Sequence, residues 1–173
     1  MIARPAPDEY PPYYETYISK VPDQNIIEVL RTQLHETARQ LENLTEGGAA
    51  FRYAPGKWTV REVLGHITDA ERIFSYRMLC IARGETTPLP GFDENSYAQV
   101  SNVETRPMKD VVLEFAHVRS ATISLVESLD RAAAERRGNA NGNPITARAL
   151  AFIIAGHERH HMNVIRERYS GKK

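Results

Sequence analysis

Four stretches of this chain repeat apolar residues at steps of three and four, and proline or glycine stands between them. This spacing is typical of amphipathic helices. It predicts helices over residues 23–45, 59–83, 107–130 and 146–169. No segment shows the alternation of apolar and polar residues that marks a half-buried strand. In a chain of 173 residues, these helices predict a single all-α domain, a four-helix bundle.

Residues at the ends of these stretches support the predicted boundaries. Thr59 followed by Glu62 is the capping-box pattern of a helix start, and Gly84 follows the same helix. Pro107 fits the first turn of the third helix. Thr146 can cap the fourth helix. The first helix is expected to end at the glycine pair of residues 47–48.

Two long segments lie outside the predicted helices. Residues 1–22 hold five prolines and four tyrosines, so they cannot form a long regular element. We expect an extended N-terminal tail that wraps the surface through its tyrosines, followed by the bundle over residues 23–170. Residues 85–106 show neither a helical nor an alternating pattern, and they predict a long crossover or lid between the second and third helices.

Composition narrows the classes of partner. Lysine and arginine number 22, and so do aspartate and glutamate, which gives a formal net charge of zero. Nucleic-acid-binding domains usually carry a basic excess, so we expect no nucleic-acid partner. The longest wholly apolar stretch, residues 149–155, is far shorter than the ~20 residues that cross a bilayer, so we expect no membrane partner. The single cysteine, Cys80, cannot form an internal disulfide, which favours a cytoplasmic protein.

The histidines carry the most distinctive chemistry of the sequence. His157 and His161 each lie about 20° from the centre of the apolar stripe of the fourth helix. Burying an unsatisfied polar group costs ~1–3 kcal/mol, so both imidazoles need partners. A shared metal would satisfy them, and so would hydrogen bonds to backbone or water. His160 belongs to the flank of the stripe, and His35 and His117 are expected at the surface.

Residues 157–161 read His-Glu-Arg-His-His, which matches the HExxH pattern of zinc peptidases. The match makes Glu158 a candidate catalytic general base. The alternatives are a solvated carboxylate and a carboxylate that supports a metal ligand without contacting the metal. No histidine follows His161, so a third metal ligand must come from upstream. His66 lies about 90° from the centre of its own stripe, so helical geometry alone does not select it. A ligand at that edge would leave a metal open to substrate.

Three arginines, Arg61, Arg72 and Arg159, could meet an anionic substrate, although a solvated helix face is the simpler interpretation of each. Trp58 precedes the second helix, where a packing anchor is the simpler interpretation and a substrate platform the alternative.

Several short motifs resemble those of the DinB or YfiT-like superfamily. Residues 55–67, Pro-Gly-Lys-Trp-Thr-Val-Arg-Glu-Val-Leu-Gly-His-Ile, resemble its first signature, and residues 69–72 and 88–93 look similar to segments that follow it. The second signature is a late helix with two histidines four apart, matched by His157 and His161. The resemblance covers about residues 24–169.

This resemblance implies an up-down-down-up four-helix bundle and a divalent metal, zinc or nickel, bound by His66, His157 and His161. Water or substrate would occupy the open positions. The late histidine pair of the family requires no intervening glutamate, so Glu158 inherits no role. Relatives include proteins labelled metal-dependent hydrolases, and S-transferases and isomerases that use a low-molecular-weight thiol. Dimers are frequent among them, so a homodimer is expected.

Two enzymatic mechanisms with a small-molecule substrate follow. Three neutral ligands leave the metal most of its charge, which can activate water for hydrolysis or a small thiol for S-transfer. Cys80 lies ~20 Å along its helix from His66, too far to act there. The alternative is a module that binds metal without catalysis, or a dimeric interaction module.

Overall fold

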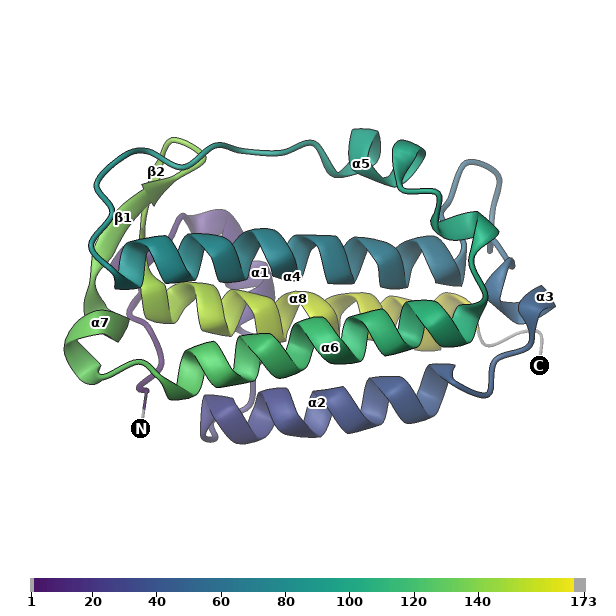
Figure 1. The fold of residues 1–173 in the computed structure, drawn as a ribbon, viewed down its shortest axis with the longest axis horizontal. Coiled ribbons are helices and arrows are strands. Elements are labelled where there is room, and N and C mark those ends of the chain that lie inside the picture. The colour runs from purple at the N-terminus through teal and green to yellow at the C-terminus, as the bar shows by residue number, and fades with distance from the viewer. Residues whose placement is uncertain (1, 170–173) are drawn as a thin grey trace.

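The structure is a computed structural model that describes residues 2–169. Four long helices form its bundle: α2 (Ile26–Leu41), α4 (Val60–Ala82), α6 (Met108–Glu127) and α8 (Ala147–Arg168). Figure 1 shows α2 and α8 running one way and α4 and α6 the other, which is the predicted up-down-down-up order. Ser170, the last residue of the predicted bundle, lies outside the described residues.

The predicted helix starts are confirmed at two caps. The Thr59 side chain accepts a hydrogen bond from the Glu62 amide, and the Glu62 carboxylate accepts one from the Thr59 amide at 2.8 Å. The Thr146 hydroxyl accepts a hydrogen bond from the Ala149 amide, 3.2 Å away, at the start of α8. Pro107 stands at the N-cap of α6, one position before the predicted first turn.

The end of the first helix was predicted too late. Helix α2 ends at Leu41, and the glycine pair of residues 47–48 belongs to a separate short helix, α3 (Glu46–Ala49). Thr45 caps α3, because its side chain accepts a hydrogen bond from the Gly48 amide. Another short helix, α7 (Arg131–Glu135), follows α6.

The predicted helical fold is confirmed, and the structure adds one short β-hairpin that no alternation in the sequence indicated. Strands β1 (Arg137–Ala140) and β2 (Asn143–Thr146) form an antiparallel hairpin, with Arg137 opposite Thr146 and Ala140 opposite Asn143. Asn141 and Gly142 join them with φ angles of 53° and 75°. Two-residue hairpin turns favour positive φ at both positions, and Asn-Gly is their usual sequence. Each strand has only four residues, too few to show alternation.

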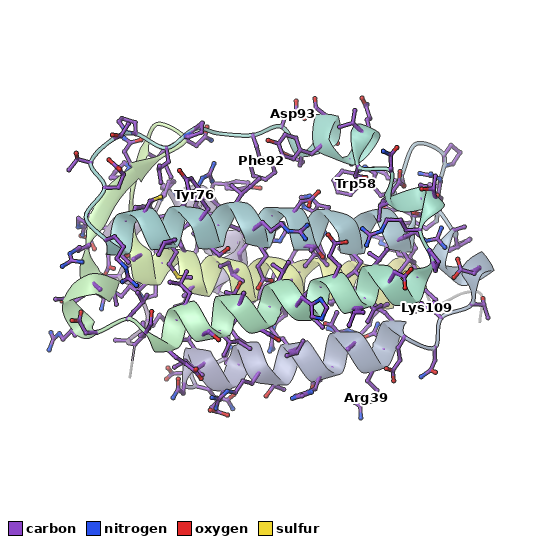
Figure 2. The ribbon with its side chains drawn as sticks, in the orientation of Figure 1. Arg39, Trp58, Tyr76, Phe92, Asp93 and Lys109 are labelled. Atoms are coloured by element: carbon purple, nitrogen blue, oxygen red, sulfur yellow. The ribbon has the colours of Figure 1, made fainter. Side chains whose placement is uncertain are left out.

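The crossover runs the length of the bundle, because α4 and α6 are parallel (Figure 1). It contains α5 (Glu94–Val100) and a 3-10 turn, η3 (Val103–Thr105), which no helical pattern in the sequence indicated. The Asp93 side chain caps α5 by accepting two backbone hydrogen bonds of 2.9 Å. Figure 2 shows Phe92 and Trp58 between this crossover and α4.

The N-terminal tail lies against α8. It contains two 3-10 turns, η1 (Pro7–Glu9) and η2 (Pro12–Tyr14), and one short helix, α1 (Glu15–Ile18). Helix α1 packs on α8, and a Cβ at Gly156 would lie 2.1 Å from the carbonyl oxygen of Tyr17. The absence of a side chain at Gly156 therefore permits this close approach.

Ionic contacts also hold the tail. The Glu9 carboxylate accepts hydrogen bonds from Arg148, with a distance of 2.7 Å to Nε, and from the Thr146 hydroxyl at 2.8 Å. Tyr10 and Tyr17 are buried, whereas Tyr13 is 65% exposed. The tyrosines do attach the tail, as predicted, but ionic contacts share that role.

A buried polar network joins the four bundle helices. Arg119 of α6, which is 0% exposed, donates to Glu71 of α4 and to Gln33 of α2. Thr37 of α2 donates to the carboxylate of Glu158 on α8. Buried charges are tolerated when they are paired and hydrogen-bonded. None of the helices within residues 2–169 is long and apolar enough to span a membrane.

Candidate metal centre

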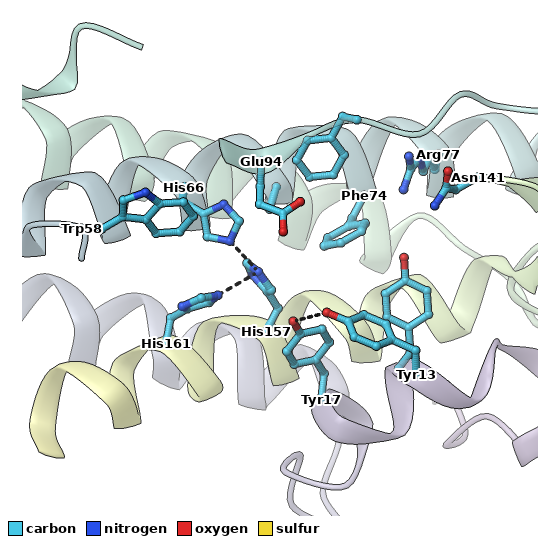
Figure 3. A pocket seen from close by; sticks show the side chains of 13 residues that line it. Tyr13, Tyr17, Trp58, His66, Phe74, Arg77, Glu94, Asn141, His157 and His161 are labelled. Atoms are coloured by element: carbon cyan, nitrogen blue, oxygen red, sulfur yellow. Dashed lines mark hydrogen bonds between the residues drawn. The ribbon is translucent and has the colours of Figure 1, made fainter. Parts of the chain in front are cut away.

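Three imidazoles from two helices meet inside the bundle. His66 comes from α4, and His157 and His161 come from successive turns of α8. The Nε2 atoms of His66 and His157 are 3.0 Å apart, and those of His157 and His161 are 3.1 Å apart (Figure 3). All three ligand nitrogens lie within 4.8 Å of one another. The structure thus brings together the three histidines that the sequence analysis selected.

The spacing suits a shared divalent cation. Metal–nitrogen bonds of about 2.0–2.1 Å at a tetrahedral angle place neighbouring nitrogens about 3.3 Å apart. A neutral imidazole nitrogen holds either one proton or one lone pair, so Nε2 of His157 cannot form two good hydrogen bonds to the other rings. A cation would use all three lone pairs, and the donor set therefore fits a metal.

Burial keeps these imidazoles neutral. It lowers the pKa of His66 to about 4 and, with repulsion from neighbouring histidines, the pKa of His161 to about 3. The pKa of His157 is also well below its ordinary value, because of burial and then the adjacent histidines. At neutral pH all three present the uncharged form that binds metals.

The neighbouring aromatic rings orient the imidazoles. The ring centroids of Trp58 and His66 are 4.9 Å apart, and those of Tyr17 and His157 are 5.2 Å apart. Trp58 is therefore both a packing residue and part of the site. His160 packs against Tyr17, at a centroid distance of 5.6 Å, on the flank of the site. The two histidines expected at the surface, His35 and His117, are exposed.

A cavity of about 250 Å³ opens beside the imidazoles. Helices α4 and α8 form its floor, and four other segments form its walls: the tail, the connection before α4, the crossover and the tip of the hairpin. Besides the three histidines, the lining residues are Tyr13, Tyr14, Tyr17, Trp58, Ala70, Phe74, Arg77, Phe92, Glu94 and Asn141. A mostly aromatic wall with a few polar groups is typical of a small-molecule site.

Glu94 is a site residue that the sequence analysis missed. It lies in the first turn of α5, lines the cavity and acts electrostatically on His66. Figure 3 shows its carboxylate pointing into the cavity. The crossover was expected to be irregular, so nothing in its pattern indicated which side chain would face inward.

The structure places Glu158, the other candidate carboxylate, elsewhere. Its side chain is 3% exposed and accepts a hydrogen bond from Thr37, and it does not line the cavity. Burial raises the pKa of Glu158. One residue after His157 is a rotation of about 100° around α8, which turns this carboxylate away from the imidazoles. Glu158, the glutamate of the HExxH pattern, therefore does not act as a general base at this cavity.

Two of the arginines proposed for an anionic substrate bind carboxylates of the chain itself. Arg61 pairs with Glu46, and Arg72 pairs with Glu114 at 2.6 Å. Neither these two nor Arg159 lines the cavity, whereas Arg77 does. The sequence signal for Arg77 was its position eleven residues after His66, three turns along the same helix face.

Comparisons with known proteins agree with this fold. The sequence profile of the DinB superfamily matches residues 29–165. A protein of Bacillus mycoides (strain KBAB4), provisionally named a metal-dependent hydrolase, is 28% identical over 158 residues, which cover 88% of this chain and 90% of that protein.

Two solved structures share the fold. YfiT from Bacillus subtilis, described as a probable metal-dependent hydrolase with an unusual four-helix bundle topology, matches with a TM-score of 0.71 and 19% identity, over 94% of this chain and 89% of its own. The mycothiol-dependent maleylpyruvate isomerase matches with a TM-score of 0.66 and 15% identity, over 84% of this chain and 61% of its own. At these identities the likeness is one of fold.

Proposed function

Because the chain belongs to the DinB superfamily, we propose that it is a metal-dependent hydrolase acting on a small molecule, with His66, His157 and His161 holding one zinc or nickel ion. The observation that carries this proposal is the meeting of three neutral imidazole nitrogens, within 4.8 Å of one another, at the wall of a cavity. Three protein ligands leave at least one coordination position for water or substrate, as catalytic sites require.

A divalent cation bound here supplies Lewis acidity, which lowers the pKa of water and polarises a carbonyl group. The three imidazoles carry no charge, so they leave that acidity largely intact. Glu94 faces the same space, and in this proposal its carboxylate would be the general base that accepts a proton from water. The aromatic side chains of Trp58, Tyr17 and Phe74 limit the entry of bulk water.

Transfer to a low-molecular-weight thiol is the second candidate function. One protein of this fold is a mycothiol-dependent isomerase. The only cysteine, Cys80, does not line the cavity, so a reacting thiol would come from a separate molecule. The two functions differ in one requirement, because only the transferase needs added thiol.

Elemental analysis of the untagged protein tests the metal site. We expect about one divalent metal ion per chain, lost in His157→Ala and in His161→Ala. The exposed His35 provides the matched control, and His35→Ala is expected to keep its metal. Retention of stoichiometric metal in both site variants would contradict the proposal.

Turnover assays of the metal-loaded protein test the reaction. A hydrolase needs no added thiol, whereas a transferase depends on glutathione, bacillithiol or mycothiol. We expect Glu94→Gln to lower turnover by about 100-fold or more while the metal stays bound. The matched variant Glu158→Gln keeps an acceptor for Thr37 and is expected to change turnover little. If Glu158→Gln lowered turnover strongly and Glu94→Gln did not, Glu158 would be the general base.

A module that binds metal without catalysis is the non-enzymatic alternative, and it would show stoichiometric metal and no turnover. The homodimer also stays a prediction, which light scattering coupled to size-exclusion chromatography tests. The expected cytoplasmic location stays a prediction as well.

A further inference from the structure

Helix α4 carries both the metal-site imidazole and a cation along one face. Arg77 follows His66 by eleven residues, which is a rotation within about 20° of three full turns and a distance of about 16 Å along the helix axis. Ala70 and Phe74 lie between them and also line the cavity. This face of α4 is therefore an apolar strip with an imidazole at one end and a guanidinium at the other.

Arg77 differs from the other buried arginines in having no carboxylate partner. Arg61, Arg77 and Arg119 are 5%, 3% and 0% exposed. Arg61 pairs with Glu46 and Arg119 pairs with Glu71, but within residues 2–169 no acidic oxygen lies within 4.0 Å of Arg77. A buried charge is costly unless it is paired.

The neighbours of Arg77 leave part of its guanidinium available. One Nη2 hydrogen bond goes to the carbonyl oxygen of Pro90, and the rings of Phe74 and Phe92 lie 5.9 Å from the guanidinium carbon. Burial lowers the pKa of Arg77, partly offset by the hydroxyl of Tyr14. These contacts position the cation at the cavity wall without neutralising it.

Asn141 lies next to Arg77 in the cavity (Figure 3). It is held there by the hairpin turn, by a 2.9 Å hydrogen bond from its backbone amide to the carbonyl of Leu89, and by close contact with Gly91. A Cβ at Gly91 would lie 2.1 Å from Oδ1 of Asn141. The amide of Asn141 thus adds a neutral hydrogen-bonding group beside the guanidinium.

We propose that Arg77 and Asn141 form a subsite for the carboxylate of the substrate, which is therefore a small organic acid. The proposal rests on the proposed function, because it places the reacting group of that acid near His66, at the other end of the cavity. A guanidinium fork matches the two oxygens of a carboxylate. A single cation in a cavity that also contains Glu94 suits a monoanion better than a phosphate dianion.

Binding to metal-free protein tests the subsite without the metal. Trp58 is the only tryptophan and lies 4.9 Å from His66, so its fluorescence reports on cavity occupancy. Hexanoate is the probe, and hexanamide is its uncharged match. We expect hexanoate to bind at least about tenfold more tightly than hexanamide, because a hydrogen bond to a charged group is worth more than a neutral one.

Variants of α4 identify the residue responsible. Arg77→Gln is expected to lose this tenfold preference, and Arg77→Lys to keep part of it. Arg72→Gln is the matched control, since Arg72 is on the same helix but outside the cavity. Equal hexanoate binding in the native protein and Arg77→Gln, or no hexanoate binding by the native protein, would overturn the proposal.

Two further measurements separate the alternatives. S-methylglutathione, which carries carboxylates but no free thiol, tests whether the subsite serves a thiol cofactor. If Arg77→Gln weakens the binding of S-methylglutathione but not of hexanoate, the subsite does not bind the substrate carboxylate and the proposal is overturned. Metal content tests the proposed function separately: Arg77→Gln should keep its metal, and metal-free His157→Ala should keep the preference for hexanoate.

Discussion

His66 and His157 place their Nε2 atoms 3.0 Å apart although one belongs to α4 and the other to α8. The two helices pack directly against each other along the bundle. A ligand that binds both nitrogens therefore stabilises the folded chain, since the unfolded chain does not hold them together.

Zinc is accordingly expected to raise the melting temperature of the metal-free protein. A ligand at 100 times its Kd adds about 2.7 kcal/mol, which corresponds to a rise of about 5–10 °C for a chain of this size. His66→Ala leaves both remaining ligands on α8 and should lose most of the rise in differential scanning calorimetry. His35→Ala should show the full rise, and a full rise in His66→Ala would mean that zinc binds elsewhere.

The Glu71–Arg119 pair predicts a large loss of stability when only one partner is removed. Nε and Nη2 of Arg119 each lie 2.8 Å from a Glu71 carboxylate oxygen, and both side chains are closed to solvent. Arg119→Met leaves a buried, unpaired carboxylate, which should cost about 3–5 kcal/mol in urea unfolding. Adding Glu71→Gln should restore part of that loss.

A surface pair provides the comparison for this variant. Arg31 and Glu127 are half-exposed, and Arg31→Met should change the free energy of unfolding by less than about 1 kcal/mol. Equal losses in Arg31→Met and Arg119→Met would show that the buried pair has no special role.

Gly156 predicts a link between tail packing and the metal site. In Gly156→Ala the new Cβ would lie 2.1 Å from the carbonyl of Tyr17, and α1 must shift. We expect a loss of about 1–3 kcal/mol and weaker zinc binding by calorimetric titration, because the ring of Tyr17 contacts His157. At Gly47 a Cβ meets no atom within 4 Å, so Gly47→Ala should be neutral or slightly stabilising. Identical zinc affinity in both variants would show that the packing of the tail does not affect zinc binding.

Glu9 predicts a loss of stability in acid. Burial alone would raise its pKa, but hydrogen bonds from Arg148, the Ala6 backbone and Thr146 outweigh burial and lower the pKa from 4.5 to about 2. The folded pKa is thus below the unfolded one, so the stabilisation is complete above pH 4.5 and is lost as the pH falls towards 2. Urea unfolding across this range should show a loss of up to about 3 kcal/mol.

Substitution of Glu9 isolates this contribution. Glu9→Gln should be less stable at neutral pH and should show a flatter dependence on pH in the acidic range. Glu28→Gln alters an exposed carboxylate and should leave the profile unchanged. A profile in Glu9→Gln that matches the native protein would assign the acid sensitivity to other groups.

The helices and two of the three imidazoles could be predicted because they depend on local periodicity. His157 and His161 share one helix, so the 3.6-residue repeat alone places them on one face. His66 is different, because its approach to His157 depends on how α4 is rotated against α8. For that reason its selection depended on the resemblance to a family and not on its own helix. Glu158 matched a sequence motif but does not line the cavity, because a motif does not determine where a side chain points.

The cavity walls could not be predicted because tertiary contacts place them. Glu94 lies on a seven-residue helix in the crossover, too short to have a clear period. Asn141 depends on a hairpin of four-residue strands, for which Asn141-Gly142 was the available signal. Arg77 had a clear spacing from His66, but its burial depends on Phe92 and the crossover above it.

All three candidate ligands come from long helices, whereas Glu94, Phe92 and Asn141 come from the segments that connect them. Loops tolerate insertion and replacement far better than packed helices do. Mutations in the crossover or the hairpin can therefore change which molecules enter without disturbing the imidazoles. Such an arrangement lets one ancestral framework give rise to descendants with different selectivities, and it makes those two connections the natural targets for redesign.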